Sequence, residues 1–182
     1  MSYDAYQRYL NGDDNGIIDI VHTYRSGLLL YVNSYVNNMT IAEDLVEDTF
    51  FRIMVKRPPL LAKKSFKAWL YTIARHITID HLRRTKLEYL HLHEEIQESE
   101  TIESLEERYL AEEQRIYVHR ALNRIKFDYR QALYLSYFED FNNEQIAKIM
   151  GKSKRQVEML LYRGRKALEQ ELSLEGLGNE NI

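Results

Sequence analysis

The sequence predicts an all-α protein made of two small helical domains joined by an acidic linker. Apolar residues recur at three- and four-residue intervals along almost the whole chain, which is the spacing of one face of an α-helix. Glycine and proline number only 7 and 2 among 182 residues, which favours helices over strands and turns. We expect a first domain over residues 1–88, a linker over 89–112, a second domain over 113–172 and a flexible tail over 173–182.

The first domain is expected to contain four helices, over residues 4–10, 15–37, 41–56 and 66–86. A capping box of Thr40 and Glu43 should open the third helix, and Pro58-Pro59 cannot continue it. Ser65 is a suitable N-cap for the fourth helix. The apolar residues expected to face the core are Ile17, Ile20, Val21, Tyr24, Leu28, Tyr31, Tyr35, Leu45, Phe50, Ile53, Phe66, Leu70, Ile73 and Ile77.

The second domain contains the pattern of a helix-turn-helix. Its helices are expected over residues 112–124, 129–138, 143–150 and 154–172. Ala147 is small enough for two helices to approach, Gly151 suits a tight turn, and Val157 can hold the second helix on the first. Ser153 and Gln156 form a capping box that should start the last helix. Ile116, Val118, Ala121, Leu122, Ile125, Ile146, Met150 and Leu160 should supply the core.

The charges are divided into three blocks, although the net charge is only −3. Lysine and arginine dominate residues 52–86 and 148–166, whereas glutamate dominates residues 88–113. Two basic surfaces on either side of an acidic connector would suit a polyanion held at two places. The alternative is that these charges only solvate helix faces.

Several classes of protein are disfavoured by the sequence. There is no cysteine, no apolar run near the roughly 18 residues of a membrane span, and no basic start followed by an apolar stretch as in a signal peptide, so we expect a cytoplasmic protein. An enzyme would have to depend on a few polar residues, namely His76, His81, His91, His93, Glu94 and Glu95. These residues lack zinc-like spacing, and no glycine-rich phosphate loop or nucleophile elbow is present. We therefore expect neither an enzyme nor a bound metal or cofactor.

Three segments together resemble the extracytoplasmic-function (ECF) group of RNA polymerase sigma factors. Residues 42–52 (AEDLVEDTFFR) resemble the polymerase-docking segment, residues 66–84 resemble the helix that melts and reads the minus-ten element, and residues 129–168 resemble the domain that reads the minus-thirty-five element. The resemblance extends from about Tyr6 to Leu172. It implies a sigma factor that binds core RNA polymerase, through the clamp helices of the largest subunit and the flap, and directs initiation at promoter DNA. It also implies an anti-sigma partner, because members of this group are usually held inactive by one.

The resemblance implies three sets of site residues. The residues implied for polymerase docking are Glu43, Asp44, Glu47, Asp48, Phe51 and Arg52. The residues implied for minus-ten recognition and melting are Lys63, Lys64, Trp69, Arg75, His76, Asp80, Arg83 and Arg84. The residues implied for minus-thirty-five recognition are Ser153, Lys154, Arg155, Glu158, Arg163, Arg165 and Lys166.

Residue chemistry agrees with these assignments. Arginine can donate two hydrogen bonds to guanine, and glutamate can accept a hydrogen bond from the amino group of cytosine. Arg155 and Glu158 are therefore suited to base contacts. His76 and Asp80 are neighbours on a helix and could wall a pocket for a flipped base.

Simpler structural roles remain open for some of the residues. The acids at Glu43 and Asp44 also suit a first helical turn. Trp69 could be a core residue and His76 a plain surface histidine.

The chain departs from the usual pattern of the group at four positions. His76 stands where asparagine is common, Lys152 where an apolar residue is usual, Glu158 where a base is common, and Gly164 where alanine is common. These departures concern the promoter sequence that is read. The alternative function is a stand-alone helix-turn-helix regulator, which would bind duplex operator DNA tightly without polymerase.

Overall fold

The computed structural model describes residues 2–57, 66–92 and 113–174, and every regular element in these ranges is an α-helix. The chain divides into two compact units, unit 1 (residues 1–104) and unit 2 (residues 105–182). The all-α class with four helices on each side of the acidic segment is confirmed. The proposed linker, residues 89–112, lies outside the described residues from residue 93 on.

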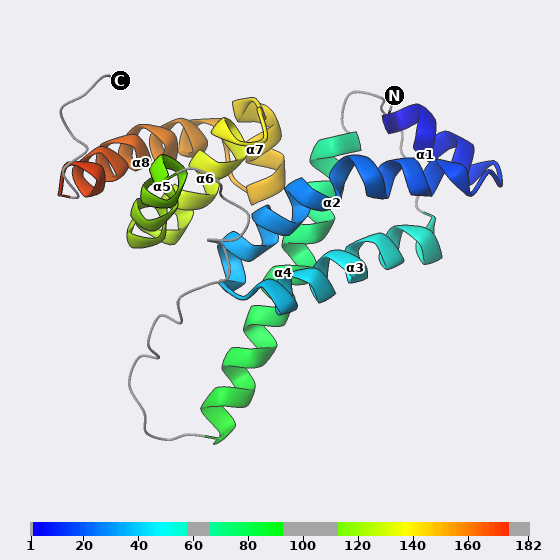
Figure 1. Cartoon of the computed structure of the whole chain (residues 1–182), viewed down its shortest axis with the longest axis horizontal. Helices are drawn as coiled ribbons and strands as arrows, with labels where there is room; N and C mark the ends of the chain where they lie inside the picture. Colours follow the sequence, from blue (N-terminus) through cyan, green and yellow to red (C-terminus); the bar gives the residue numbers. More distant parts are fainter. Residues whose placement is uncertain (1, 58–65, 93–112, 175–182) are drawn as a thin grey trace. The chain divides into compact units, whose positions relative to one another are not determined.

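Unit 1 contains α1 (Ser2–Leu10), α2 (Asn15–Val36), α3 (Met39–Lys56) and α4 (Phe66–Leu92). Helices α1 and α3 both pack on α2, and α4 packs across α2 and α3. Figure 1 shows α4 crossing this pair and continuing well past it. Residues 79–86 of α4 are accordingly half-buried or exposed. The helix therefore does not end near Lys86, as the sequence suggested, but continues to Leu92.

Aromatic rings fill the core of unit 1. Tyr6, Tyr31 and Tyr71 are almost fully buried, and the hydroxyl groups of Tyr31 and Tyr35 are 2.7 Å apart. Burial raises the pKa of Tyr31 well above its usual value and that of Tyr6 to about 12. These phenols therefore stay neutral and can share hydrogen bonds in the core.

The rotation of α4 differs from the sequence prediction. Ile73 and Ile77 are only half-buried, while Ala74 and Thr78 face the core. The hydroxyl group of Thr78 can be buried because it donates to the carbonyl oxygen of Ala74 at 2.8 Å. Val21 on α2 is also only half-buried, whereas the other predicted core positions of α2 and α3 are buried.

Helix α3 begins two residues earlier than expected, at Met39. The residue before it, Asn38, is the N-cap, and its side-chain oxygen accepts from the amide of Ile41 at 3.1 Å. The preceding helix ends with Asn37 in the left-handed conformation, at φ 49°. Because Asn37 already turns the chain, the cap falls on Asn38, and the predicted capping box of Thr40 and Glu43 was wrong. Ser65, the expected cap of α4, lies outside the described residues.

Helices α1 and α2 cross very closely at Gly16. A Cβ atom at this position would lie 2.7 Å from the backbone nitrogen of Tyr9 and would overlap the carbonyl oxygen of Ala5. Tyr9 in turn donates from its hydroxyl group to the carbonyl oxygen of Met54 on α3, at 3.1 Å. The lack of a side chain at residue 16 therefore sets the position of α1 on the rest of unit 1.

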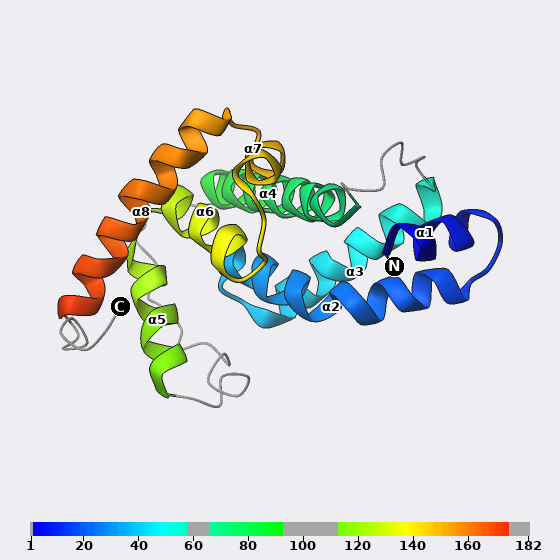
Figure 2. The same cartoon turned by 90° about the horizontal axis from the view of Figure 1, so that it is seen from above.

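Unit 2 contains α5 (Glu113–Arg124), α6 (Phe127–Tyr137), α7 (Asn143–Met150) and α8 (Lys154–Leu174). The longest helix, α8, packs on the other three (Figure 2). The core residues that α7 and α8 share are Ile146, Ile149, Met150, Val157 and Leu161. Leu160, which the sequence placed in this core, is half-buried, and Leu161 takes its place. Val118 is half-buried, and Ile116 has no described side chain.

The local geometry of the helix-turn-helix is as predicted. Gly151 ends α7 with φ 63°, a conformation that disfavours residues with a side chain. The side chain of Asn142 caps α7, and Gln145 completes the capping box. The amide of Ser153 donates to the side-chain oxygen of Gln156 at 2.8 Å, and the amide of Gln156 donates back to the Ser153 hydroxyl at 3.2 Å. Both helix starts are thus fixed by residues three apart in sequence.

Gly164 and Lys152, two of the positions at which the chain departs from the usual pattern of the group, both lie where unit 2 packs closely. Gly164 is buried where α8 meets α6, and an added Cβ would lie 3.2 Å from the Cβ of Tyr129. Lys152 forms an ion pair with Asp128 at 2.9 Å, which holds the turn against the start of α6. A glycine and a charged residue at these two positions therefore suit the packing of this particular chain.

Candidate nucleic-acid and polymerase interfaces

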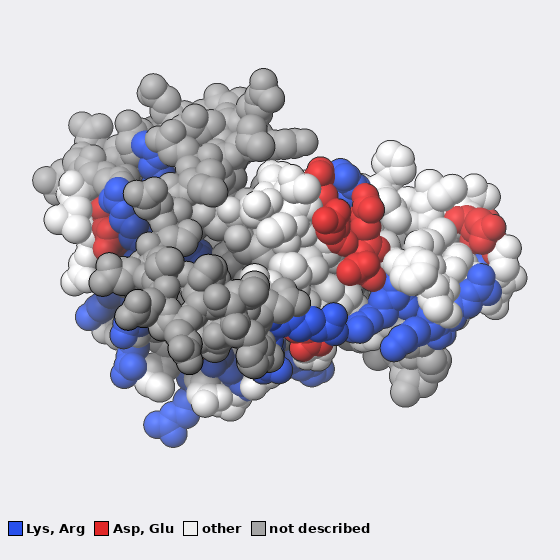
Figure 3. Space-filling view, turned by 90° about the horizontal axis from the view of Figure 1, so that it is seen from below, with Lys and Arg blue, Asp and Glu red and all other residues white. Residues whose placement is uncertain are grey.

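One face of α3 is acidic at its start and apolar further along. Asp44, Glu47 and Asp48 are exposed, whereas Glu43 is half-buried and lies 3.6 Å from Arg25. Figure 3 shows a compact acidic patch with basic side chains close beside it.

Two large apolar side chains follow the acids on α3. Phe51 and Val55 lie four residues apart, and they are 61% and 62% exposed. Val55 was not identified from the sequence. A buried core position was the more probable place for a valine in a helix, so nothing in the pattern marked its exposure.

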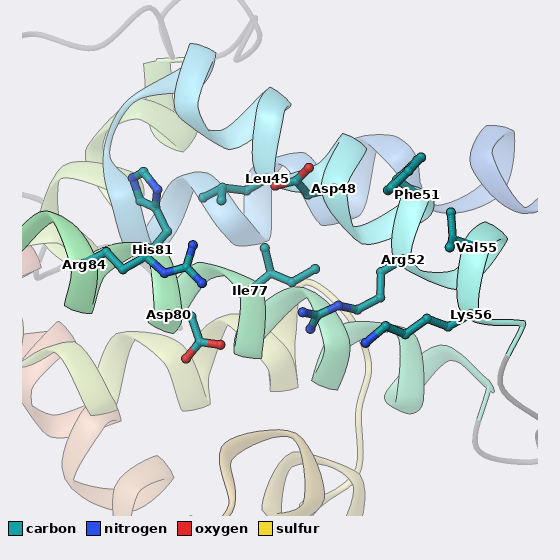
Figure 4. A pocket seen from close by; sticks show the side chains of 10 residues that line it. All are labelled: Leu45, Asp48, Phe51, Arg52, Val55, Lys56, Ile77, Asp80, His81 and Arg84. Atoms are coloured by element: carbon teal, nitrogen blue, oxygen red, sulfur yellow. The ribbon is translucent and has the colours of Figure 1, made fainter.

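A groove of about 340 Å³ lies between α3 and α4 (Figure 4). It brings docking candidates on α3 together with minus-ten candidates on α4. The side chains that line it are Leu45, Asp48, Phe51, Arg52, Val55, Lys56, Ile77, Asp80, His81 and Arg84. In Figure 4 the side chains of Arg52 and Lys56 extend from α3 toward α4. Two residue sets that the sequence assigned to different partners are therefore neighbours on one surface.

Helix α4 presents a stripe of polar and aromatic residues that borders this groove and shares Asp80 with it. Trp69, His76, Asp80 and Arg83 follow one another at helical spacing, so they lie on one side of the helix. His76 is exposed, and Asp80 lies 4.0 Å from Arg83 in a loose, solvent-exposed pair. Lys63 and Lys64 lie outside the described residues.

Trp69 belongs both to this stripe and to the aromatic core. It is half-buried, and its ring centroid lies 5.4 Å from that of Tyr6 and 5.6 Å from that of Phe66. Arg75 is half-buried on another side of α4, and its charge counteracts the rise in the pKa of Tyr31. The structure thus places Arg75 away from the stripe formed by His76, Asp80 and Arg83.

Helix α8 has a buried face and an opposite exposed face. Val157, Leu161 and Gly164 are buried against the unit. All seven minus-thirty-five candidates are exposed, namely Ser153, Lys154, Arg155, Glu158, Arg163, Arg165 and Lys166. Helical spacing places Arg155 and Lys166 near the centre of the exposed face, opposite Val157, and Glu158 on the flank of that face.

Several of the bases on α8 have partners within unit 2. Lys154 pairs with Glu144 at 3.4 Å, and a guanidinium nitrogen of Arg165 lies 3.5 Å from the hydroxyl oxygen of Tyr137. Arg163 lines a shallow hollow that also contains Tyr129 and Lys152.

The exposed face of α8 also carries two large apolar residues that were not identified from the sequence. Met159 and Tyr162 are 47% and 54% exposed. The amino group of Lys166 lies 5.0 Å from the centre of the Tyr162 ring. The hydrogen bond with Lys166, and then its positive charge, lower the pKa of Tyr162.

No three histidine, aspartate or glutamate side chains in the described ranges gather closely enough to hold a metal ion. The side chains of His91, His93, Glu94 and Glu95 are outside the described part of the chain. Among the described helices, none is long and apolar enough to cross a membrane.

Two family models match the chain in the order expected for the two units. The one described as Sigma-70 region 2 matches residues 20–88, and the one described as Sigma-70, region 4 matches residues 115–168. Together they span more than half of the chain. The first ends near the described end of α4, and the second covers the helix-turn-helix.

Individual proteins match over most of their length. The RNA polymerase sigma factor SigZ of Bacillus subtilis is 27% identical over 159 residues, which are 85% of this chain and 85% of that protein. The ECF RNA polymerase sigma factor SigW of the same organism is 25% identical over 171 residues, 88% of this chain and 91% of that protein.

Solved structures agree with these matches. The sigma factor RpoE from Bartonella quintana, crystallised with the anti-sigma factor NepR, superposes with a TM-score of 0.72 at 25% identity, over 85% of this chain and 95% of that one. CnrH, solved with the cytosolic domain of CnrY, superposes with a TM-score of 0.67 at 18% identity over 95% of both chains, and supports the fold alone. The chain therefore belongs to the extracytoplasmic-function group of the sigma-70 family: it binds core RNA polymerase and directs initiation at specific promoters.

Proposed function

We propose that three helices divide the work of this sigma factor: α3 binds the polymerase, α4 binds the melted minus-ten strand, and α8 reads the minus-thirty-five duplex. The observation that carries the proposal is the exposed face of α8. A helix-turn-helix with both starts capped holds Arg155 and Lys166 outward, opposite the buried Val157, and leaves Glu158 exposed on the flank. Such a rigid, cationic second helix has the geometry of a recognition helix in the major groove.

The proposed docking surface on α3 combines charge with apolar area. The acids Asp44, Glu47 and Asp48 would attract basic side chains of the clamp helices, and Phe51 would supply apolar burial next to them. Aromatic residues of this kind commonly dominate the energetics of protein interfaces. Arg52 lines the same groove as Arg84, so we expect it at the border between polymerase and DNA.

On α4, the exposed stripe would bind the non-template strand. Removing a base from the duplex costs a few kcal/mol, and stacking on an aromatic ring returns about 1–3 kcal/mol per base. Trp69 packs on Tyr6 and Phe66 and is half-exposed, so it can offer a rigid ring edge for this purpose. The site would be completed by His76, Asp80, Arg83 and Arg84, together with Lys63 and Lys64.

Polymerase performs the chemistry in this scheme, and the chain supplies promoter choice and strand separation without being an enzyme. We place it in the cytoplasm, where its partners are. Residues 1–88 and 113–172 would act as the two binding domains, and the acidic linker between them would lie near the active-site cleft, where its negative charge resembles that of nucleic acid. An anti-sigma protein is a further proposed partner, because the similar sigma factor RpoE was crystallised with the anti-sigma factor NepR.

In vitro transcription tests whether the chain directs initiation through these three helices. The purified chain is mixed with the core polymerase of its own host and a library of genomic fragments, and the start sites are mapped by sequencing. We expect initiation at a small set of sites that share minus-thirty-five and minus-ten elements. No initiation, combined with tight binding of the chain alone to duplex DNA, would instead support a stand-alone helix-turn-helix regulator.

Replacing Arg155 by alanine should relax the base preference at one position of the minus-thirty-five element and cost about 1–3 kcal/mol of binding. Arg155 lies in the middle of the exposed face, where a guanidinium group can bond guanine at two atoms. The measurement is competitive binding of the polymerase complex to promoters carrying each base at each position. Arg155→Lys is the sharper variant, because lysine keeps the charge and loses the bidentate geometry. Equal weakening on all sequences would make Arg155 a phosphate contact.

Replacing Arg165 by alanine should weaken binding to every promoter and lower the slope of log affinity against log salt by about one. Its guanidinium group is tied to Tyr137 beside the exposed face, which suits a contact with one phosphate. The measurement is a salt titration of complex formation on a single promoter. Lys126→Gln is the control, because Lys126 is an exposed base of the same unit outside α8. A slope that does not change in Arg165→Ala would refute the phosphate contact.

A further inference from the structure

The exposed face of α8 carries apolar area among its charges. Met159 and Tyr162 are about half-exposed, whereas Val157 and Leu161 on the same helix are buried. Exposed apolar surface is unfavourable in water, so a side chain kept in this position is suited to burial against a partner. The partner has to satisfy the charged neighbours as well.

The neighbours of these two residues are those of the proposed base-reading surface. Met159 is four residues after Arg155, and Tyr162 is four residues after Glu158, so each pair is adjacent on the helix. Lys166 lies over the Tyr162 ring at 5.0 Å. The apolar patch is therefore enclosed by two bases and one acid, which favours a polyanion over an apolar protein groove.

The spacing along the helix also matches the spacing of base pairs. Arg155 and Tyr162 are seven residues apart, which is about 10 Å along an α-helix and close to three base-pair steps of B-DNA. Met159 is about 6 Å from Arg155 along the same axis. A helix lying in the major groove would thus place the two apolar side chains over different base pairs from the one that Arg155 contacts.

In the major groove, the one strongly apolar group that a base offers is the 5-methyl group of thymine. We propose that Met159 and Tyr162 contact thymine methyl groups in the minus-thirty-five element and thereby determine part of its sequence. The inference rests on the proposed role of α8 and adds a chemical ligand for two side chains to it. Tyr162 is the stronger candidate, because Lys166 holds its ring and can itself bind the neighbouring phosphate.

Deoxyuridine tests the contact, because it differs from thymidine only by lacking the 5-methyl group. Each thymine of the minus-thirty-five element of a mapped promoter is replaced in turn, and binding of the full chain with core polymerase is measured. We expect one or two positions to lose affinity about fourfold, the effect of exposing one methyl-sized group. The sensitive positions should lie within about three base pairs of the guanine read by Arg155.

Two variants link the methyl effect to the residues. Met159→Ala and Tyr162→Ala should each weaken binding to the thymine promoter and abolish the penalty for deoxyuridine at one position. Both positions are exposed and alanine favours helices, so we expect the fold to persist, which circular dichroism checks. Leu174→Ala is the matched control, since Leu174 is an 80% exposed apolar residue at the end of the same helix.

The outcomes separate this inference from the broader proposal. Promoter-specific initiation without any deoxyuridine penalty, or a penalty that survives in both variants, would overturn the methyl contact and leave the role of α8 intact. Loss of polymerase binding in the variants, with no change in the deoxyuridine penalty, would assign the patch to a protein partner and also overturn it. Absence of initiation at any promoter would remove both proposals together.

Discussion

Replacing Asp48 by lysine should abolish stable binding of the chain to core RNA polymerase while leaving the fold of unit 1 intact. Asp48 is exposed on α3, on the rim of the groove that also contains Phe51 and Arg52. The substitution exchanges an attraction to basic clamp residues for a repulsion at the centre of the proposed interface. Losing one partner of a charge pair in an interface costs about 2–5 kcal/mol, and charge reversal falls at the upper end of that range.

The measurement for Asp48→Lys is the dissociation constant for core polymerase, from pull-down or fluorescence titration. Asp14→Lys is a suitable control, because Asp14 is an exposed acid of the same unit at the start of α2, away from the proposed interface. Unfolding of Asp48→Lys should occur at the same denaturant concentration as for the wild-type chain, since the Asp48 side chain is exposed. Binding that persists within threefold of the wild-type value would reject α3 as the docking helix.

Replacing Gly16 by alanine should lower the free energy of unfolding of unit 1 by about 2–3 kcal/mol. The added Cβ would overlap the carbonyl oxygen of Ala5 and approach the backbone nitrogen of Tyr9 at 2.7 Å. Backbone atoms cannot move aside by rotating a side chain, so α1 would have to shift as a whole. That shift would disturb the contacts that Tyr6 makes with Phe66 and Trp69.

The effect of Gly16→Ala on the free energy of unfolding is measured by urea unfolding, with tryptophan fluorescence as the signal. Trp69 is the single tryptophan of the chain, and its ring lies 5.4 Å from that of Tyr6 on α1. Gly164→Ala is a matched control with a smaller expected effect, because the atoms closest to its added Cβ are side-chain atoms of Tyr129 and Leu133. An unfolding midpoint of Gly16→Ala equal to that of the wild-type chain would show that α1 does not depend on this close crossing.

Much of the helix-turn-helix could be predicted from the sequence because its determinants are local. The cap of α8 joins Ser153 to Gln156, three residues apart, and Gly151 fixes the turn by its own backbone conformation. Such interactions are encoded within a few residues, so their pattern can be recognised without knowing the fold. The charged faces of α3 and α8 were also evident, because polar periodicity survives in any helix.

The sites on α4 could be predicted only in part. The spacing of His76, Asp80 and Arg83 shows that they share a side, but not which side faces the core. Apolar periodicity favoured Ile73 and Ile77, yet the helix buries Ala74 and Thr78. Aromatic rings of α1 and α2 pack on Phe66, Trp69 and Tyr71 of α4 at centroid distances of 5.2–5.8 Å, and these contacts between distant parts of the chain set the rotation of the helix.

The sequence alone determined the helical class, the order of the two units, the turn at Gly151 and the separation of acidic from basic segments, because each of these depends on residues close together in the chain. The tertiary structure decided the rotation of α4, the cap at Asn38, the groove that joins Arg52 to Arg84, and the exposure of Met159 and Tyr162. These features depend on how helices from distant parts of the chain pack against one another. A helix can be predicted from its own residues, but the side of it that remains exposed is determined by its neighbours.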